Sequence, residues 1–115
     1  MIDRKRILHL LNDIESDLAE RTISTTNTDK FGQAICAFAN DLPNHNQSGY
    51  LIIGAEDDGN IKGLHVTDEL LKNIAAIRTD GNIQPQPSMT VEKMTIEGKN
   101  MIVVEVQPAN FPPVK

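Results

Sequence analysis

The chain has 115 residues, enough for one domain with its own hydrophobic core. Hydrophobic residues make up 39% of it, but only three Phe and one Tyr are aromatic, so the core must be built from aliphatic side chains. A single cysteine excludes an internal disulfide, no apolar run reaches the roughly 18–20 residues of a membrane span, and the formal net charge of −5 has the wrong sign for a protein that coats DNA electrostatically. With no apolar secretory segment at the start, these features predict a small cytoplasmic domain that does not contact a membrane.

The first predicted elements are a helix, a short strand and a loop. Residues 5–14 place an apolar stripe on one helical face, with Asp3 as the N-cap and Arg4–Arg6 as the solvated end; the stripe consists of Ile7, Leu10, Leu11 and Ile14. Acidic and apolar residues then alternate, which predicts a strand over Asp17–Ile23. Residues 24–29 are rich in Ser, Thr and Asn, as is typical of a loop that caps the next helix.

A second helix and a buried strand form the predicted centre of the domain. The helix carries one continuous apolar face and ends at Pro43; the face consists of Phe31, Ala34, Ile35, Phe38 and Leu42. The short apolar run Tyr50–Ala55 predicts a strand buried on both faces. Asp58-Gly59 then predicts a tight turn that returns the chain through a further strand from Ile61 to Leu64.

The last third of the chain predicts one helix and two strands. Thr67 opens the helix, which ends at Asp80-Gly81, and the strands run over about Ser88–Ile96 and Met101–Gln107. The order of elements predicts an α+β (mixed α/β) fold, in which a mixed sheet of about five strands packs against about three helices. We expect a single domain over residues 1–115, cut within a longer protein because its ending does not resemble a natural terminus.

Several familiar sites are not supported by the residue spacing. Gly54 and Gly59 have the spacing of a phosphate loop, but the following Lys-Ser/Thr pair is missing and three carboxylates there would repel phosphate. The ligand alternation of an EF-hand is also missing, and the three histidines show no zinc spacing. Cys36 is interpreted as a small buried hydrophobic residue. We therefore expect no resident cofactor.

A group of three acids has two interpretations. Glu15 and Glu20 bracket the start of the strand predicted over residues 17–23, and Asp57 follows the strand predicted over residues 50–55. Acids at turns and strand ends usually serve solubility. Gathered by the fold, three carboxylates would instead hold a divalent cation, which polarises a phosphodiester and ionises a water. The spacing alone leaves both interpretations open.

The central block of the chain resembles a known family. The residues are Ala37-Phe-Ala-Asn40, Gly49-Tyr-Leu-Ile-Ile-Gly54-Ala-Glu-Asp57-Asp-Gly59 and Ile61-Lys-Gly63. This pattern, with acids before a strand, resembles the Schlafen-type Alba-like domain family, whose members are treated as DNA-binding domains common in bacterial regulators. The later Asp80–Pro85 and Phe111–Lys115 resemble one bacterial subgroup, so that the resemblance covers roughly residues 13 to 115.

The resemblance implies a nucleic-acid-binding domain of a bacterial transcriptional-regulator-like protein, with DNA favoured over RNA as its partner. Phosphate contacts are then expected from the scattered basic residues, with Arg4–Arg6 assisting; these are Arg21, Lys30, Lys62 and Arg78. Such contacts would weaken steeply as the salt concentration rises.

Two alternatives remain beside this interpretation. Animal Schlafen relatives that cleave RNA resemble the chain at their metal-binding acids, which fall on Glu15, Glu20 and Asp57. That match implies a metal-dependent ribonuclease-like site holding Mg²⁺ or Mn²⁺. The other alternative is a dimerisation or protein-interaction domain, in which an uncovered strand edge pairs two copies of the chain.

Overall fold

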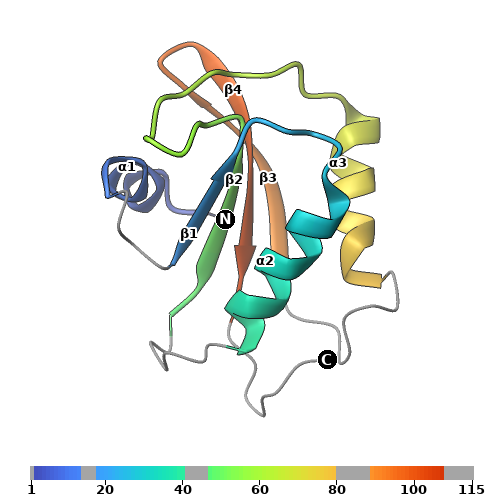
Figure 1. The fold of residues 1–115 in the computed structure, drawn as a ribbon. Coiled ribbons are helices and arrows are strands. Elements are labelled where there is room, and N and C mark those ends of the chain that lie inside the picture. The colour runs from blue at the N-terminus through green and yellow to red at the C-terminus, as the bar shows by residue number, and fades with distance from the viewer. Residues whose placement is uncertain (1, 14–17, 41–46, 80–88, 108–115) are drawn as a thin grey trace.

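The computed structural model describes residues 2–13, 18–40, 47–79 and 89–107. In chain order these form α1 (Arg4–Asn12), β1 (Ala19–Thr22), α2 (Thr28–Asn40), β2 (Gly49–Ile53), α3 (Asp68–Ala75), the 3₁₀ turn η1 (Ala76–Thr79), β3 (Met89–Ile96) and β4 (Lys99–Val106). The strands make one mixed sheet in the order β1-β2-β4-β3, with α1 on one side and α2 and α3 on the other (Figure 1). This confirms the predicted α+β fold, with four described strands against an expectation of about five.

The helices begin where the sequence places their caps. The Asp3 carboxylate accepts a hydrogen bond from the Lys5 main-chain N–H, and the Thr67 hydroxyl accepts one from the Leu70 N–H at 3.1 Å. Asn27 does the same for the first turn of α2, because its Oδ1 accepts from the Lys30 N–H at 3.1 Å. No helix in the described part of the chain is long and apolar enough to cross a bilayer.

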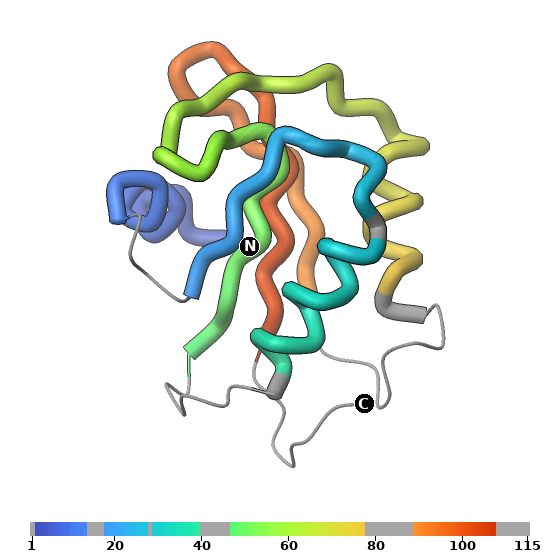
Figure 2. The backbone as a smooth tube through the Cα atoms, in the orientation of Figure 1, coloured from blue at the N-terminus to red at the C-terminus, as the bar shows by residue number. Residues whose placement is uncertain are grey.

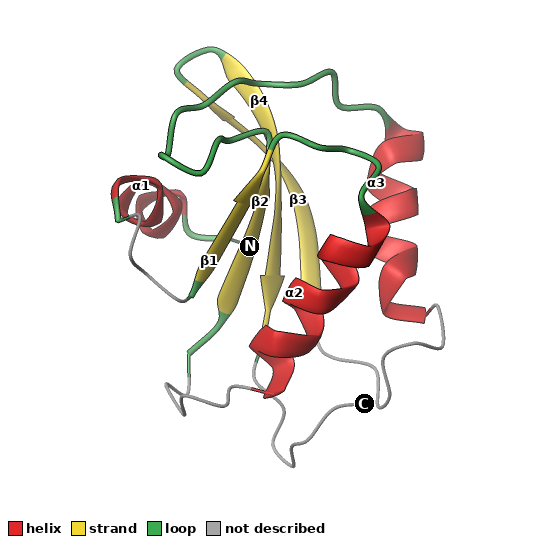
Figure 3. Cartoon of the chain, in the orientation of Figure 1, coloured by secondary structure: helices red, strands yellow, loops and turns green. Residues whose placement is uncertain are grey.

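Strand β2 is the centre of the core, because all five of its residues are buried. It pairs with β1 in parallel and with β4 in antiparallel register, and helices cover both faces of the sheet (Figure 3). Its side chains alternate between two apolar clusters, with Ile52 on the α1 side and Leu51 and Ile53 on the α2 side. Phe31, Phe38 and Tyr50 are the aromatic members of the two clusters formed by the described residues, and the other members are aliphatic side chains and methionines.

The strand predicted from Ile61 to Leu64 is not formed. A single antiparallel bridge joins Ala55 to Ile61, and the main-chain N–H groups of Lys62 and Gly63 both donate to the Gly54 carbonyl at 2.9 and 3.1 Å. This doubled bond curls the segment into a turn, so its N–H groups cannot form a strand ladder. The segment instead runs beside the β3–β4 connection, where Leu64 N–H donates to the Asn100 carbonyl (Figure 2).

The β3–β4 connection is shorter than predicted. Glu97 and Gly98 form a two-residue turn with positive φ angles of 57° and 75°, and pairing resumes at once between Ile96 and Lys99. Two central residues with φ above zero are typical of the tight hairpin turn whose twist matches that of the strands. The expected four-residue connection over 97–100 is therefore wrong by two residues.

Arg21 ties α1 to the sheet. Its side chain lies on the α1 side of β1 and is only 5% exposed. One guanidinium nitrogen, Nη2, donates to the main-chain carbonyls of Leu10 at 2.5 Å and Asp13 at 2.7 Å, both at the end of α1. Carbonyls at a helix C-terminus lack partners within the helix and carry partial negative charge, so a buried guanidinium suits them.

We therefore expect Arg21→Met to destabilise the domain. The substitution keeps an unbranched apolar stem but removes the Arg21 donor from both carbonyls; Leu10 O keeps the Asp13 N–H at 3.3 Å, whereas the part-buried Asp13 carbonyl is left without a described donor. Such a loss costs about 1–3 kcal/mol. Urea denaturation would measure this loss in the free energy of unfolding. Lys72→Met, which removes an exposed cation from α3, is the control and should change it by less than about 0.5 kcal/mol. Equal stability of the two variants would show that Arg21 does not hold α1.

A second prediction concerns the ionisation of Tyr50, which belongs to the apolar cluster on the α1 side of the sheet. Its hydroxyl donates to Glu105 Oε2 at 2.7 Å. Burial, followed by the hydrogen bond to Glu105 and the charge of that carboxylate, raises the pKa of Tyr50 from 10.0 to about 12.

Because Tyr50 is the only tyrosine and the chain has no Trp, phenolate absorbance reports this group alone. We expect its titration in the folded protein to have a midpoint near pH 12, and Glu105→Gln to lower it. In the unfolded chain the Tyr50 phenol ionises near pH 10. The contribution of neutral Tyr50 to the stability of the fold is therefore complete below pH 10 and is lost as the pH rises through 12. A midpoint near 10 before unfolding would contradict this assignment.

Candidate functional site

The first candidate site lies at the carboxyl ends of the parallel strands β1 and β2. In α/β folds, ligands bind outside such strand ends and beside the N-terminus of the crossover helix. Here β1 ends at Thr22, and Ser24 accepts from the N–H groups of Thr26 and Asn27 at 3.3 and 3.2 Å. This turn leads directly into α2 and places Lys30 in its first turn.

The acidic turn after β2 is held in a fixed shape. Asp58 accepts two hydrogen bonds from Asn60, one from the main-chain N–H and one from the side-chain amide, each at 3.0 Å. Gly59 has φ 91°, and a Cβ on it would overlap the Leu11 carbonyl oxygen of α1. Glycine is therefore required here both for the turn and for its contact with α1. The side chain of Asp57 stays exposed.

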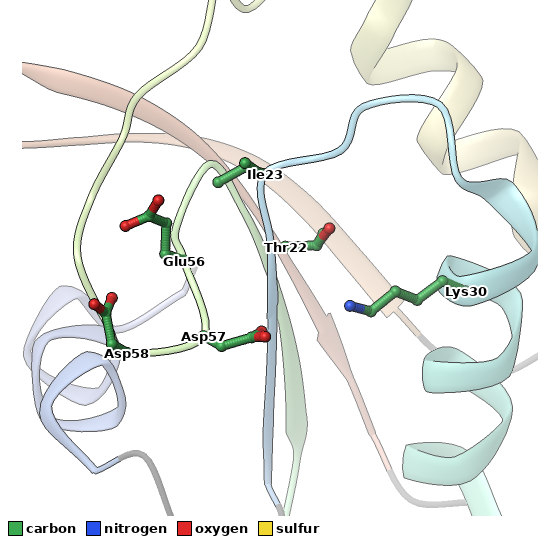
Figure 4. A pocket seen from close by; sticks show the side chains of 6 residues that line it. All are labelled: Thr22, Ile23, Lys30, Glu56, Asp57 and Asp58. Carbon is green, nitrogen blue, oxygen red and sulfur yellow. The ribbon is translucent and has the colours of Figure 1, made fainter.

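These segments surround an open hollow of about 480 Å³, lined by Thr22, Ile23, Lys30, Glu56, Asp57 and Asp58. Figure 4 shows Lys30 reaching from α2 toward the end of β1, while the three acids come from the turn on the opposite side. A second hollow of about 540 Å³ also uses Lys30 and is lined in addition by Glu20, Asn27, Asp29, Gln33, Ala34 and Ala37. Lys30 thus separates two hollows, one bordered by Asp57 and the other by Glu20.

The three acids predicted to form a metal or catalytic site are placed differently. Glu15 lies outside the described residues. Glu20 contacts Lys30, with Oε1 and Nζ 3.4 Å apart, and Asp57 lies across the neighbouring hollow. Among the described residues, no three His, Cys, Asp or Glu side chains converge as a metal site requires.

The four cations predicted to contact phosphate also differ in their surroundings. Arg21 is buried and bonded to α1, so it does not present its charge at the surface, contrary to the expectation. Lys30 pairs with Glu20, and Lys62 pairs with Glu56 at 3.7 Å. Arg78 belongs to η1, but its side chain is outside the described part of the structure.

The electrostatics around the two hollows follow from these positions. Lys30 and Lys62 stand among five carboxylates, which are Glu20, Asp29, Glu56, Asp57 and Asp58. The excess of negative charge favours cations over phosphate at the two hollows. We call these seven residues the α2–turn surface.

Two residues of the site escaped the sequence analysis. Ile23 is 55% exposed at the end of β1 and provides an apolar part of the first hollow, and Asn27 fixes the position of Lys30. The Ser-x-x-Asn spacing over residues 24–27 followed by a helix was the signal available for Asn27. Nothing in the sequence pattern distinguishes Ile23 from a core residue.

Comparison with known proteins adds the following. The sequence profile of the family described as Schlafen, AlbA_2 matches residues 14–115. No curated protein sequence matches the chain. The fold is similar to the N-terminal domain of a protein related to the ATP-dependent DNA helicase RecG, from Nitrosomonas europaea, with a TM-score of 0.68 and 22% identity over 96% of this chain and 76% of that one.

The DIP2311 protein from Corynebacterium diphtheriae is similar as well, with a TM-score of 0.53 and 18% identity. The match covers 96% of this chain but only 23% of that protein. At these identities the two structures bear on the fold alone. The profile match, in contrast, covers nearly the whole chain, and the chain therefore belongs to the Schlafen AlbA_2 family.

Proposed function

We propose that this chain is a nucleic-acid-binding domain, with DNA as its partner, in a bacterial transcriptional-regulator-like protein. The observation that carries the proposal is the family match over residues 14–115. The shared fold with a domain of a DNA helicase-related protein supports it, since that domain covers nearly all of this chain.

The charge of the chain constrains how such binding would work. A net charge of −5 repels a polyanion at long range, so the affinity must come from basic side chains close to the phosphates. Repulsion and attraction are both screened over about 10 Å at 0.1 M salt. The attraction to the phosphates depends on the release of counterions from the nucleic acid. In the complex, the attraction is therefore more sensitive to salt than the repulsion by the net charge.

Lys30 and Lys62 would reach phosphate only by leaving their carboxylate partners. Both ion pairs are solvent-exposed, with the side chains of Lys30 and Glu20 35% and 44% exposed. Exposed pairs of this kind contribute about 0–1 kcal/mol, so exchanging a carboxylate for a phosphate costs little in itself. The surrounding carboxylates, rather than the pairs, oppose such contacts.

The proposal predicts measurable binding of a duplex at low salt that is lost as salt rises. Fluorescence anisotropy of a labelled duplex DNA, and of a structured RNA of the same length, would give the dissociation constant from about 20 to 200 mM KCl. We expect the plot of log affinity against log salt to be linear with a negative slope, and DNA to bind at least as tightly as RNA. Absence of binding to both at the lowest salt would refute the proposed function.

A metal-dependent ribonuclease-like activity is a second candidate, favoured by one observation. Glu20 and Asp57, which correspond to two of the three acids expected for such a site, border two hollows that meet at Lys30. Carboxylate oxygens suit Mg²⁺ or Mn²⁺, so these residues fit the ion in kind, provided that the Lys30 ammonium leaves Glu20. A bound ion there would polarise a phosphodiester.

This second candidate predicts cleavage that depends on Mn²⁺ and on Asp57. Asp57→Asn removes a carboxylate that would hold the ion and should therefore abolish cleavage. It should not unfold the domain, because the side chain keeps its size, is exposed and makes no described ion pair. A labelled structured RNA, incubated with and without Mn²⁺ and resolved on a gel, would show this. Asp68→Asn on α3 is the matched control. The ribonuclease-like function would be refuted if the Asp57→Asn variant still cleaved the RNA, or if the unchanged protein did not cleave it.

A further inference from the structure

We propose that the outer edge of β3 pairs two copies of this chain into a weak dimer, in which the two strands run antiparallel about a two-fold axis at Val91. Strand β3 is the last in the sheet order β1-β2-β4-β3, so a described strand occupies only one of its edges (Figure 1). The inference goes beyond the proposed function, because it concerns a protein partner and assigns it an edge and a register.

The hairpin turn decides which main-chain groups of β3 point outward. The two residues that flank a two-residue turn exchange both of their main-chain hydrogen bonds, and the residues along each strand then alternate. Ile96 flanks the turn and bonds to β4, so every second residue before it directs its N–H and C=O inward and the others direct theirs outward. The outward residues are Met89, Val91, Lys93 and Thr95. In agreement, the Thr95 carbonyl accepts a hydrogen bond from Arg4, which belongs to another element.

The free part of this edge is bounded at both ends. Arg4 Nη1 holds the Thr95 carbonyl at 2.7 Å, so a partner strand cannot use that group, and β3 itself begins at Met89. Between these limits, residues 89–93 direct their outward N–H and C=O groups toward no main-chain partner in the described part of the chain. Unpaired groups along a strand edge are a template for another strand. Val91 is the middle residue of this free segment.

Two copies of the free segment complement each other when Val91 lies on the axis. Val91 then stands opposite Val91 of the second copy, and Met89 stands opposite the apolar stem of Lys93, so that outward groups meet outward groups. On the other face of the strand, the exposed Thr90 stands opposite Glu92. Glu92 accepts the Ile2 N–H through Oε2, so its other oxygen can accept from the Thr90 hydroxyl of the second copy. No like charges stand directly opposite each other in this register.

The neighbouring registers are less favourable. A shift by one pairing step toward Thr95 places Glu92 opposite Glu92 of the second copy, where the two carboxylates repel, and places Met89 opposite the carbonyl that Arg4 holds. A shift in the other direction leaves Lys93 beyond the start of the partner's β3, so fewer main-chain groups are paired. The register centred on Val91 therefore pairs the whole free segment without a charge conflict.

Two features make the pairing weak and set its response to salt. A contact confined to residues 89–93 of each copy lies below the roughly 1,200 Å² of stable complexes, so we expect a dissociation constant of about 10–100 μM. Each copy also carries a net charge of −5, and the two copies repel each other. Salt screens this repulsion and should strengthen the dimer, which is the reverse of its effect on nucleic-acid binding.

The test compares two proline variants of the 115-residue chain by sedimentation equilibrium. Val91→Pro removes an outward N–H at the axis and leaves the ladder with β4 intact, because β4 does not use that N–H. Thr95→Pro is the matched control, because it removes an outward N–H beyond the free segment. Protein concentrations from about 10 μM to 1 mM would be measured at about 0.15 and 0.5 M KCl, after thermal melts followed by circular dichroism show that both variants fold.

We expect the unchanged chain to dimerise more tightly at the higher salt concentration. Val91→Pro should raise the dissociation constant at least about tenfold, and Thr95→Pro should change it by less than about threefold. A third variant, Thr90→Lys, keeps the test decisive if a proline variant does not fold. Its new ammonium would stand opposite Glu92 of the second copy and should tighten the dimer about threefold.

Three results would each overturn the inference. They are a monomeric unchanged chain at the highest concentration, an equal loss of dimer in the two proline variants, and a dimer that Thr90→Lys does not tighten. None of them bears on nucleic-acid binding, which is measured separately.

Discussion

Burial of β2 on both faces is the constraint from which the rest of the architecture follows. A strand with five buried residues needs a neighbour on each side and a layer on each face. Because β1 pairs with it in parallel, the chain must cross over between them, and α2 makes that crossover on one face. The other face is covered by α1, from the segment before β1, together with Ala55 and Ile61 of the turn after β2. The helices before and after β1, α1 and α2, therefore lie on opposite faces of the sheet.

The crossover also decides which charges meet. The crossover brings the start of α2 beside the end of β1, and so sets Lys30 next to Glu20 and the acidic turn near both. The basic run of α1 lies at the start of that helix, where Arg4 donates to the Thr95 carbonyl of β3. Arg21 joins β1 to the end of α1, because it lies in the strand and donates to two carbonyls of the helix end.

The sequence was a sound guide wherever a local pattern decides the structure. Asp3 and Thr67 cap helices as predicted because capping depends on residues two or three positions away. The predicted strand at 61–64 failed because the Gly54 carbonyl accepts two N–H groups, a non-repeating contact that no periodicity reveals. Arg21 was expected at the surface, since Arg is rarely buried without partners, and its partners are carbonyls of another element. Likewise, the pairing of Lys30 with Glu20 depends on the parallel crossover, so charge spacing could not predict which cations are free for phosphate.

The two-residue turn at Glu97 and Gly98 has a consequence for the order in which the fold assembles. It joins strands that are adjacent in the chain and paired over eight residue pairs, so β3 and β4 need to close only a very small loop. Hairpins of this kind form in about 1–10 μs. The β1–β2 pair, in contrast, must enclose the whole of α2, and pairings that are distant in sequence form slowly. We therefore expect the hairpin to act as the template on which β2 docks, and the arrival of the parallel strand β1, with α1 attached through Arg21, to complete the domain.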